Sequence, residues 1–219
     1  MHEIYQLASG ILVWVALIVF VGGTAGRLIR MAITARKKDA VIYQYFSFYY
    51  ALRSILHWII PFGSMSMRAR PAMTLVAFIF HICLIITPIF LAAHVILIAE
   101  SWGIGWAYLP NAVADIMTIL VILGCLFFLL RRIVQRDVRY LSTPGDFVLL
   151  LVVAAPFVTG IWTYHQWSGF EIAGIVHMLS GELMLICLPF TRLFHMALFP
   201  FTRGYAGSEA GGVRRARDW

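Results

Sequence analysis

The sequence predicts an all-α integral membrane protein, a bundle of five transmembrane helices. Of its 219 residues, 62% are hydrophobic and only 12% are charged, which leaves too little polar surface to cover a water-soluble globule. Several separate stretches are long and apolar enough to cross a bilayer, which takes about 20 residues of helix. When the chain is threaded through five spans, all 17 basic residues fall on one side.

We expect the five spans at residues 8–29, 73–98, 112–130, 147–164 and 172–199. The first is an apolar run that ends in basic residues. The second holds two histidines and Pro88 in an otherwise apolar sequence. The third and fourth flank the basic segment RRIVQRDVR, and the fifth contains HMLSGELMLICLPFTRLFH, in which ionisable side chains interrupt an apolar stretch.

The segment 41–60 has the length of a sixth span, but it carries several polar side chains, among them Arg53 and His57. If it crossed, Arg68, Arg70 and the basic group at 131–139 would move outside, and the usual excess of cytoplasmic positive charge would be lost. We therefore expect an amphipathic helix at the cytoplasmic interface. The N-terminus then lies outside and the C-terminus in the cytoplasm, with residues 1–202 as the membrane domain and 203–219 as a flexible basic tail.

Several classes of function are excluded by what the sequence lacks. The net charge of +7 reflects the basic residues that gather on one side of the membrane. It does not indicate nucleic-acid binding, because no soluble basic domain exists to carry it. Cys83, Cys125 and Cys187 stand alone in apolar spans, so there is neither a CxxC pair for an iron–sulfur cluster nor a CxxCH for covalent haem. The sequence also has no Gly-rich phosphate loop, HExxH or GxSxG, which argues against nucleotide-driven and hydrolytic chemistry.

Four histidines lie inside the spans, His81 and His94 on the second and His177 and His195 on the fifth. His177 and His195 are 18 positions apart, which returns a continuous helix to the same face about 27 Å further on. His81 and His94 are 13 positions apart, so an ideal helix separates them by about 220° and a kink at Pro88 is needed to share a face. Because the two spans are antiparallel, His94 matches His177 in depth near the outer surface, and His81 matches His195 near the inner surface.

Pairs of neutral imidazoles at two depths suit the axial positions of two haem irons, with each macrocycle in the apolar space between helices. A single membrane histidine can equally form a hydrogen bond between helices or belong to a proton relay. A transporter or proton channel that uses a histidine relay is therefore the alternative, although internal repeats typical of transporters are not evident. A purely structural anchor would leave four intramembrane histidines unexplained.

The stretch HMLSGELMLICLPFTRLFHMALFPFTR, which includes His177, Arg192 and His195, resembles the final span of the gamma subunit of respiratory nitrate reductase. The segment RRIVQRDVRYLSTPGDFVLLLV resembles that subunit's third loop and fourth span. The resemblance implies a five-span cytochrome b with two haem b groups, in the cytoplasmic membrane of a prokaryote. It implies His94 with His177 as ligands of the outer haem and His81 with His195 as ligands of the inner one. In this family electrons pass between menaquinol near the outer haem and cytoplasmic iron–sulfur subunits.

The gap between His81 and His94 is longer than in the nitrate reductase subunit. This gap, with SILHWIIPFGSMSMRARP and FHICLIITPIFLAAH, is closer to related cytochrome b subunits of sulfate reducers. Those subunits occur with heterodisulfide-reductase-like iron–sulfur proteins and periplasmic multihaem cytochromes c, as in the tetrahaem cytochrome c3 complex and the sulfite-reduction-associated complex. The resemblance thus implies a cytoplasmic iron–sulfur partner, heterodisulfide-reductase-like or ferredoxin-like, and a periplasmic multihaem cytochrome c.

Other ionisable residues take candidate roles from their positions. Arg192, one turn before His195, is either a partner for a haem propionate or an interfacial anchor. Glu182 lies inside the span and is either a protonatable group near the outer quinone site or a hydrogen-bonding residue. Further candidates for proton exchange at the outer side, which are otherwise solvated loop-edge residues, are Glu100, Asp115, Tyr164, His165 and Glu171.

Overall fold

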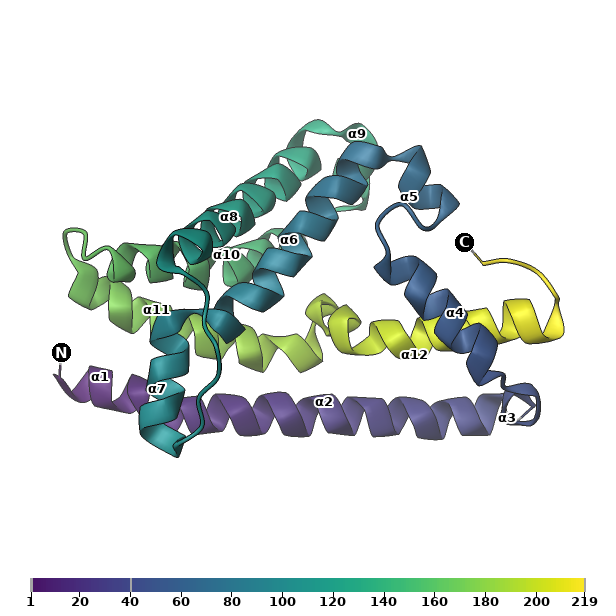
Figure 1. Ribbon diagram of the computed structural model, residues 1–219, viewed down its shortest axis with the longest axis horizontal. Helices are drawn as coiled ribbons and strands as arrows, with labels where there is room; N and C mark the ends of the chain where they lie inside the picture. The colour runs from purple at the N-terminus through teal and green to yellow at the C-terminus, as the bar shows by residue number, and fades with distance from the viewer. Residues whose placement is uncertain (1, 40, 219) are drawn as a thin grey trace. The chain divides into compact units, whose positions relative to one another are not determined.

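The computed structural model describes residues 2–39 and 41–218, and in these ranges the regular structure is helical, without a strand (Figure 1). Within this part of the chain, five helical stretches are long and apolar enough to cross a membrane: His2–Lys38, Pro71–Trp102, Asn111–Val134, Pro144–Tyr164 and Phe170–Phe190. The predicted fold class, all-α with five transmembrane helices, is confirmed, and the chain is a multi-pass membrane protein. The segment 41–60 is not among the five.

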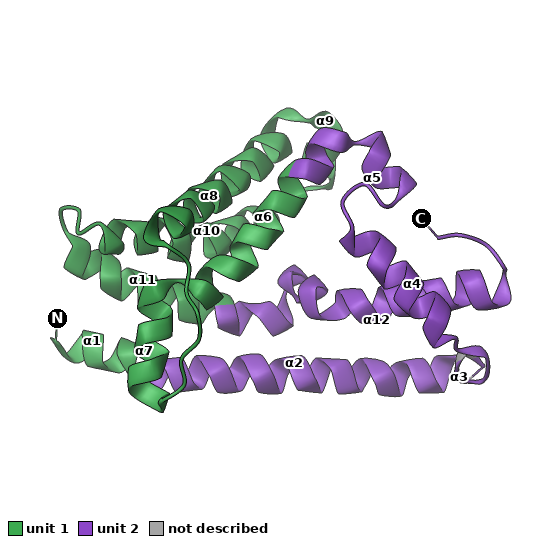
Figure 2. Cartoon of the chain, viewed as in Figure 1, with its two compact units in different colours: residues 1–10, 76–184 green, residues 11–75, 185–219 purple. Residues whose placement is uncertain are grey.

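The chain divides into two compact units, shown in two colours in Figure 2. The first consists of Met1–Gly10 and Val76–Met184, and the second of Ile11–Leu75 and Leu185–Trp219. Three of the four membrane histidines, His81, His94 and His177, belong to the first unit, whereas His195 belongs to the second.

The first unit contains α1 (His2–Ser9), most of α6 (Pro71–Phe90), α7 (Ala92–Trp102), α8 (Asn111–Val134), α9 (Arg136–Leu141), α10 (Pro144–Tyr164) and most of α11 (Phe170–Cys187). Helices α8 and α10 pack together. The ring of Phe80 on α6 lies against Gly124 of α8, where an added Cβ would come within 2.6 Å of the ring. Glycine at this position therefore lets α6 approach α8 closely.

The turn between α8 and α10 is held by polar contacts at the start of α10. Thr143 and Asp146 form a capping box, in which each satisfies a backbone amide of the other's turn. The Asp146 carboxylate is 4% exposed and lies 3.7 Å from the guanidinium of Arg132 on α8. A buried carboxylate needs such partners, so this capping box also joins two transmembrane helices.

The second span is interrupted between α6 and α7. Pro88 lies in the last turn of α6, and Leu91, between the two helices, has extended backbone with φ −66° and ψ 128°. Proline disfavours a continuous helix around it, and the interruption follows three residues after Pro88, at Leu91. The kink predicted at Pro88 is confirmed.

This interruption leaves three carbonyls at the end of α6 without the amide partners of a continuous helix. Each accepts a hydrogen bond from a group outside α6: Pro88 O from His94 Nδ1 at 2.8 Å, Ile89 O from Trp106 Nε1 at 2.9 Å, and Phe90 O from the Leu109 amide at 2.8 Å. A membrane helix can be broken only where such donors exist, because lipid supplies none. His94, one of the candidate site residues, therefore also stabilises the break between α6 and α7 by donating one of these hydrogen bonds.

The second unit contains α2 (Ile11–Lys38), α3 (Ile42–Tyr45), α4 (Phe48–Ile59), α5 (Met65–Ala69), α12 (His195–Gly207) and a π-helical turn, Ser208–Val213. Helix α4 packs on α12 with Ala51 and Ser54 buried, while Phe48, Leu52 and Leu56 are exposed on another face. The amphipathic helix predicted at 41–60 is thus present as α3 and α4, separated by the extended residues Phe46 and Ser47.

The fifth predicted span, residues 172–199, is not one continuous helix. Helix α11 ends at Cys187, and two short 3-10 turns, Leu188–Phe190 and Arg192–Phe194, precede α12. Between the turns Thr191 is extended, with φ −115° and ψ −170°. The predicted shared face of His177 and His195 required an unbroken helix, and the helix is interrupted at Pro189 and Thr191 before His195.

The segment 203–219, predicted as a flexible tail, is helical through Val213 and packs on α4. A Cβ at Gly207 would lie 2.2 Å from Ser54 Cβ, and a Cβ at Gly211 would lie 2.2 Å from the Tyr50 ring. Ser54 Oγ also donates a 2.5 Å hydrogen bond to Asp218. Gly207 and Gly211 form a small-residue surface that allows close packing against α4.

Candidate functional site

His94 and His177 lie together in the first unit. Their ring centres are 5.9 Å apart and their planes are inclined by 26°. Both side chains are half-buried. His94 comes from α7, just after the break, and His177 from the first half of α11. The structure thus brings together the two residues predicted as the outer pair.

The two imidazoles are held through the same ring atom. Nδ1 of His94 is 2.8 Å from the carbonyl of Pro88, and Nδ1 of His177 is 2.8 Å from the carbonyl of Pro156 on α10. A carbonyl oxygen only accepts hydrogen bonds, so Nδ1 carries the proton in each neutral ring and Nε2 keeps its lone pair. Neither Nε2 atom can therefore donate a hydrogen bond to the other. Each has a lone pair that can bind a metal ion or a proton.

Two features of α10 create the position of His177. Pro156, inside the helix, supplies the carbonyl that binds Nδ1. One turn later, a Cβ at Gly160 would lie 3.0 Å from Cε1 and 3.1 Å from Nδ1 of His177, so the imidazole occupies space that only glycine leaves open. Bonds of this kind from a ligand's second nitrogen fix the tautomer and orientation of metal-binding histidines.

His81 and His195, the predicted inner pair, lie in different units. On α6, His81 Nδ1 is 2.7 Å from the carbonyl of Ala77, and its ring packs edge-on against Phe80 at 5.2 Å. His195 opens α12, with Nδ1 2.9 Å from the carbonyl of Arg192. Both rings therefore keep the proton on Nδ1, as His94 and His177 do.

A hydrogen bond from Nδ1 to a nearby backbone carbonyl does not by itself distinguish a candidate ligand from other histidines. His57 on α4, which is not a predicted ligand, has its Nδ1 3.0 Å from the carbonyl of Arg53 in the same way as His81. The bond of His177 differs, because its acceptor lies 21 residues earlier on another helix. The outer pair is thus the more specific arrangement.

Glu182 is 8% exposed on α11, and its Oε1 has no hydrogen-bond partner among the described residues. A buried carboxyl oxygen without a partner, inside a membrane span, indicates a site that another group completes. Arg192 lies in the second 3-10 turn and is exposed. Its carbonyl accepts a hydrogen bond from Nδ1 of His195.

Among the candidates for proton exchange, the side chains of His165 and Asp115 contact each other. The His165 Nε2 atom is 3.2 Å from the Asp115 carboxylate, and the side chains are 38% and 30% exposed. The imidazole also stacks on Trp167 at 5.9 Å, and Tyr164 packs against it edge-on at 5.3 Å. Glu100 on α7 and Glu171 at the start of α11 are exposed.

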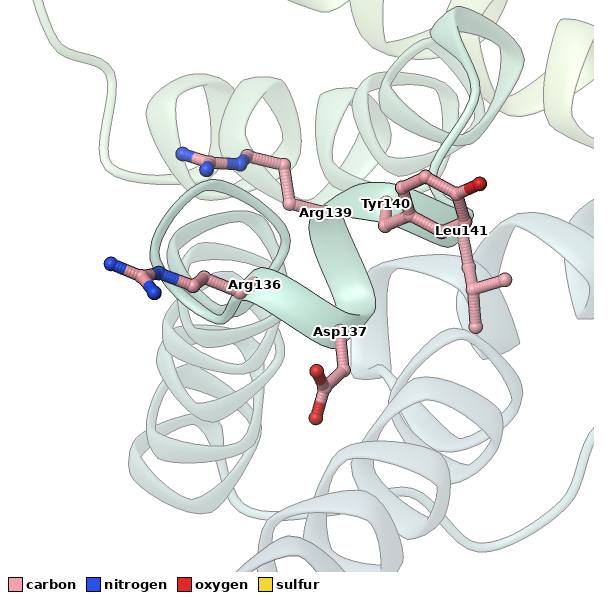
Figure 3. Close-up of a pocket in the computed structure, with 5 residues that line it drawn as sticks. All are labelled: Arg136, Asp137, Arg139, Tyr140 and Leu141. Carbon is pink, nitrogen blue, oxygen red and sulfur yellow. The ribbon is translucent and has the colours of Figure 1, made fainter.

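A shallow pocket lies on α9, lined by Arg136, Asp137, Arg139, Tyr140 and Leu141 (Figure 3). In the close-up the side chains of Arg136 and Arg139 extend to the same side, and the Asp137 carboxylate points in a different direction. The pocket contains none of the four membrane histidines, and it was not predicted from the sequence. Across the described residues, no three or more His, Cys, Asp or Glu side chains are grouped to hold a metal ion.

Arg27 is a residue that sequence reasoning placed only among the inner basic residues. In the second unit its Nη1 donates to the carbonyl of Pro189 at 2.6 Å and to that of Thr191 at 3.3 Å. Its guanidinium lies 4.2 Å from the ring centre of Phe194. The signal that could have indicated this role is the combination of an arginine late in the first span with a proline late in the fifth.

Comparison with known proteins gives one full-length relationship and no assigned function. A protein of Nitratidesulfovibrio vulgaris Hildenborough, named simply "Protein", is 37% identical over 223 residues, covering 96% of this chain and 97% of the relative. The two chains belong to one family. Identity over nearly the full length of both members means that this family is defined by the whole membrane chain and not by one segment. No protein-family model and no solved structure matches the chain.

Proposed function

We propose that the protein is a di-haem b-type cytochrome subunit of a membrane respiratory complex. His94 and His177 would hold the outer haem, and His81 and His195 the inner one. The subunit would connect a menaquinone or menaquinol site near the outer haem with cytoplasmic iron–sulfur subunits, and a periplasmic multihaem cytochrome c would be a further partner. Its membrane would be the cytoplasmic membrane of a prokaryote, with the N-terminus outside.

The arrangement of His94 and His177 is the observation that carries this proposal. Two imidazoles that held one metal ion through nitrogen bonds of about 2 Å each would have ring centres roughly 6 Å apart. The ring centres are 5.9 Å apart, the planes are close to parallel, and both rings have the tautomer that leaves Nε2 able to bind a metal. A haem site needs only these two protein ligands, because the macrocycle supplies the others.

The remaining residues support the chemistry around the ligands. Haem b supplies one-electron transfer when it is bound, whereas a quinol releases protons as well as electrons. His165, which ends α10, and Asp115 on α8 form the candidate pair for proton uptake. His165 lies nine residues, or about 13 Å of helix, beyond Pro156, which anchors His177. Glu182, with its buried unpartnered oxygen, is the second candidate. Arg192 is the candidate partner for a propionate of the inner haem.

A proton channel with a histidine relay is the second candidate, and the same pair motivates it. Two Nε2 lone pairs can share a proton as well as a metal ion. The two functions differ in their cofactor requirement, since a relay conducts protons in vesicles without haem, whereas the cytochrome requires haem for any redox activity.

The deciding experiment is a reduced-minus-oxidised absorption spectrum with haem quantitation on the purified full-length protein. We expect two low-spin b haems per chain. A folded, haem-free preparation that conducts protons in vesicles would replace the proposal with the relay.

Matched variants then test the ligands. His177→Ala should remove one haem and leave the other, whereas His57→Ala should leave both, because His57 makes the same local bond without a predicted ligand role. Survival of both haems in His177→Ala would refute the outer pair.

A further inference from the structure

The break between α11 and α12 is packed against α2 through two positions, Gly23 and Arg27, one helical turn apart. At Gly23 an added Cβ would lie 2.9 Å from Pro189 Cγ and 3.1 Å from the Phe190 ring, so only glycine admits the first 3-10 turn. At Arg27 the guanidinium binds the carbonyls of Pro189 and Thr191. All of these residues belong to the second unit.

The break needs an outside donor at this place. Its own atoms satisfy part of the backbone, since Thr191 donates to Cys187 O through its amide at 3.1 Å and its hydroxyl at 2.8 Å. The carbonyl of Pro189 receives its bond from Arg27, 162 residues away in the sequence, at 2.6 Å. Backbone carbonyls left unpaired in a membrane span are costly, so a side chain that reaches them decides whether the break forms.

The break leads directly to His195. Phe194, against which the Arg27 guanidinium lies, is 2% exposed, and the next residue is His195, whose Nδ1 binds the carbonyl of Arg192 within the second 3-10 turn. A guanidinium that holds both ends of Pro189–Thr191 and also packs on Phe194 fixes the chain on each side of the redirection.

We propose that Arg27, supported by Gly23, is the positioning residue for His195 and sets the geometry and the reduction potential of the inner haem. This inference rests on the proposed function, because it presumes a haem at His195. Arg27 acts through the backbone of the break and through its positive charge, which favours the reduced form of a nearby redox centre.

An interfacial anchor is the competing explanation, because an arginine at the cytoplasmic end of a span also obeys the charge asymmetry of membrane proteins. Arg30 lies one turn further along α2 and carries the same charge. Arg30→Gln therefore removes as much positive charge from this end of the span as Arg27→Gln does. Gly22 and Gly26, where an added Cβ meets nothing within 4 Å, are matched controls for Gly23.

The test is a potentiometric titration of the purified full-length protein, followed by absorption and electron paramagnetic resonance. The inner haem is identified as the one that remains in His177→Ala. We expect Arg27→Gln to lose the inner haem or to lower its midpoint potential and change its low-spin signal, with the outer haem unchanged. Arg27→Lys should restore part of the effect, and Arg30→Gln should match the wild type.

Gly23→Ala provides an independent measurement, because it retains the charge and disturbs only the contact with Pro189. It should change the inner haem signal, whereas Gly22→Ala and Gly26→Ala should not. Wild-type-like inner haem in Gly23→Ala, or equal effects of Arg27→Gln and Arg30→Gln, would overturn the inference while leaving the di-haem proposal intact. Absence of haem from the wild type would instead refute the proposed function itself.

Discussion

The imidazole of His177 lies directly over Gly160 of the neighbouring helix, at a distance that leaves no room for a side chain. An added Cβ would be 3.0 Å from Cε1 of the ring. Because the same ring is bound through Nδ1 to Pro156, it cannot move away from α10 without losing that bond. The position of the candidate ligand is therefore set by two residues of α10 that do not themselves bind a metal.

Gly160→Ala should displace His177 and remove or perturb the outer haem. Inserting a methyl group into a packed site costs about 1–3 kcal/mol, enough to break the bond to Pro156. Gly181→Ala, on α11 itself, is the control because an added Cβ there meets nothing within 4 Å. Haem quantitation and low-spin resonance signals measure the outcome, and identical outer-haem signals in the two variants would contradict the packing argument.

Trp106→Phe should loosen the break in the second span. The indole N–H binds the carbonyl of Ile89 at 2.9 Å, and the loss of such a bond costs about 1 kcal/mol or more when the carbonyl is left unpaired. The expected result is a lower thermal unfolding midpoint and a broader outer-haem signal, since His94 caps the same break. Tyr108→Phe in the same loop, where the side chain is 59% exposed, serves as the control. Equal midpoints for the two variants would mean that Trp106 does not support the break.

The five spans and the kink at Pro88 could be predicted because each follows from a property of the local sequence. A bilayer requires a long apolar run, and proline lacks the N–H that a helix uses. The break before His195 could not be predicted in the same way. Proline is often tolerated in membrane helices, and the donor that binds the carbonyl of Pro189, Arg27, is far away in the sequence.

The candidate site likewise has one part that could be predicted from the sequence and another that could not. Counting depth along antiparallel spans paired His94 with His177 correctly, because that argument needs only the direction of each helix. The acceptors that orient the two rings, Pro88 and Pro156, and the open space at Gly160, could not be predicted, since they depend on how α7, α10 and α11 pack.

Gly207→Ala should release the C-terminal segment from α4. Its Cβ would lie 2.2 Å from Ser54 Cβ and 2.8 Å from the Tyr50 carbonyl, contacts that no rotamer change can relieve. We expect faster tryptic cleavage after Arg203, which is half-buried in α12. Gly212→Ala is the control, because its nearest new contact, at 3.5 Å from Ser47 Cβ, is an ordinary one. Unchanged cleavage in Gly207→Ala would show that the glycine does not hold the segment.

The hydroxyl of Tyr205 donates a hydrogen bond to the Asp39 carboxylate, and this bond raises the pKa of Tyr205. An acid whose pKa is raised on folding stabilises the fold below its unfolded pKa, about 10 for tyrosine, and this contribution is lost as the pH rises through the folded value. Stability should therefore fall more steeply above about pH 10 in the wild type than in Tyr205→Phe. Thermal unfolding of both proteins across this range measures the difference, and parallel curves would exclude a contribution from this bond.

Asp115→Asn should slow quinol-driven reduction of the haems without removing either haem. The Asp115 carboxylate lies 3.2 Å from Nε2 of His165, so it holds the imidazole in the orientation in which His165 would take up a proton. We expect a decrease on the order of tenfold, smaller than the roughly 10²–10⁴-fold effect of a group that transfers the proton itself, because Asp115 acts through His165. His165→Gln should cause the larger decrease.

Glu3→Gln is the control for this experiment, because Glu3 is an exposed carboxylate on the same predicted side of the membrane and has no candidate role. Stopped-flow reduction by a menaquinol analogue gives the rate, and chemical reduction by dithionite shows that the haems themselves are intact. A rate unchanged in both Asp115→Asn and His165→Gln would remove this pair from the quinol reaction. The next candidate to test would be Glu182, since its buried Oε1 lies in the same unit as His177.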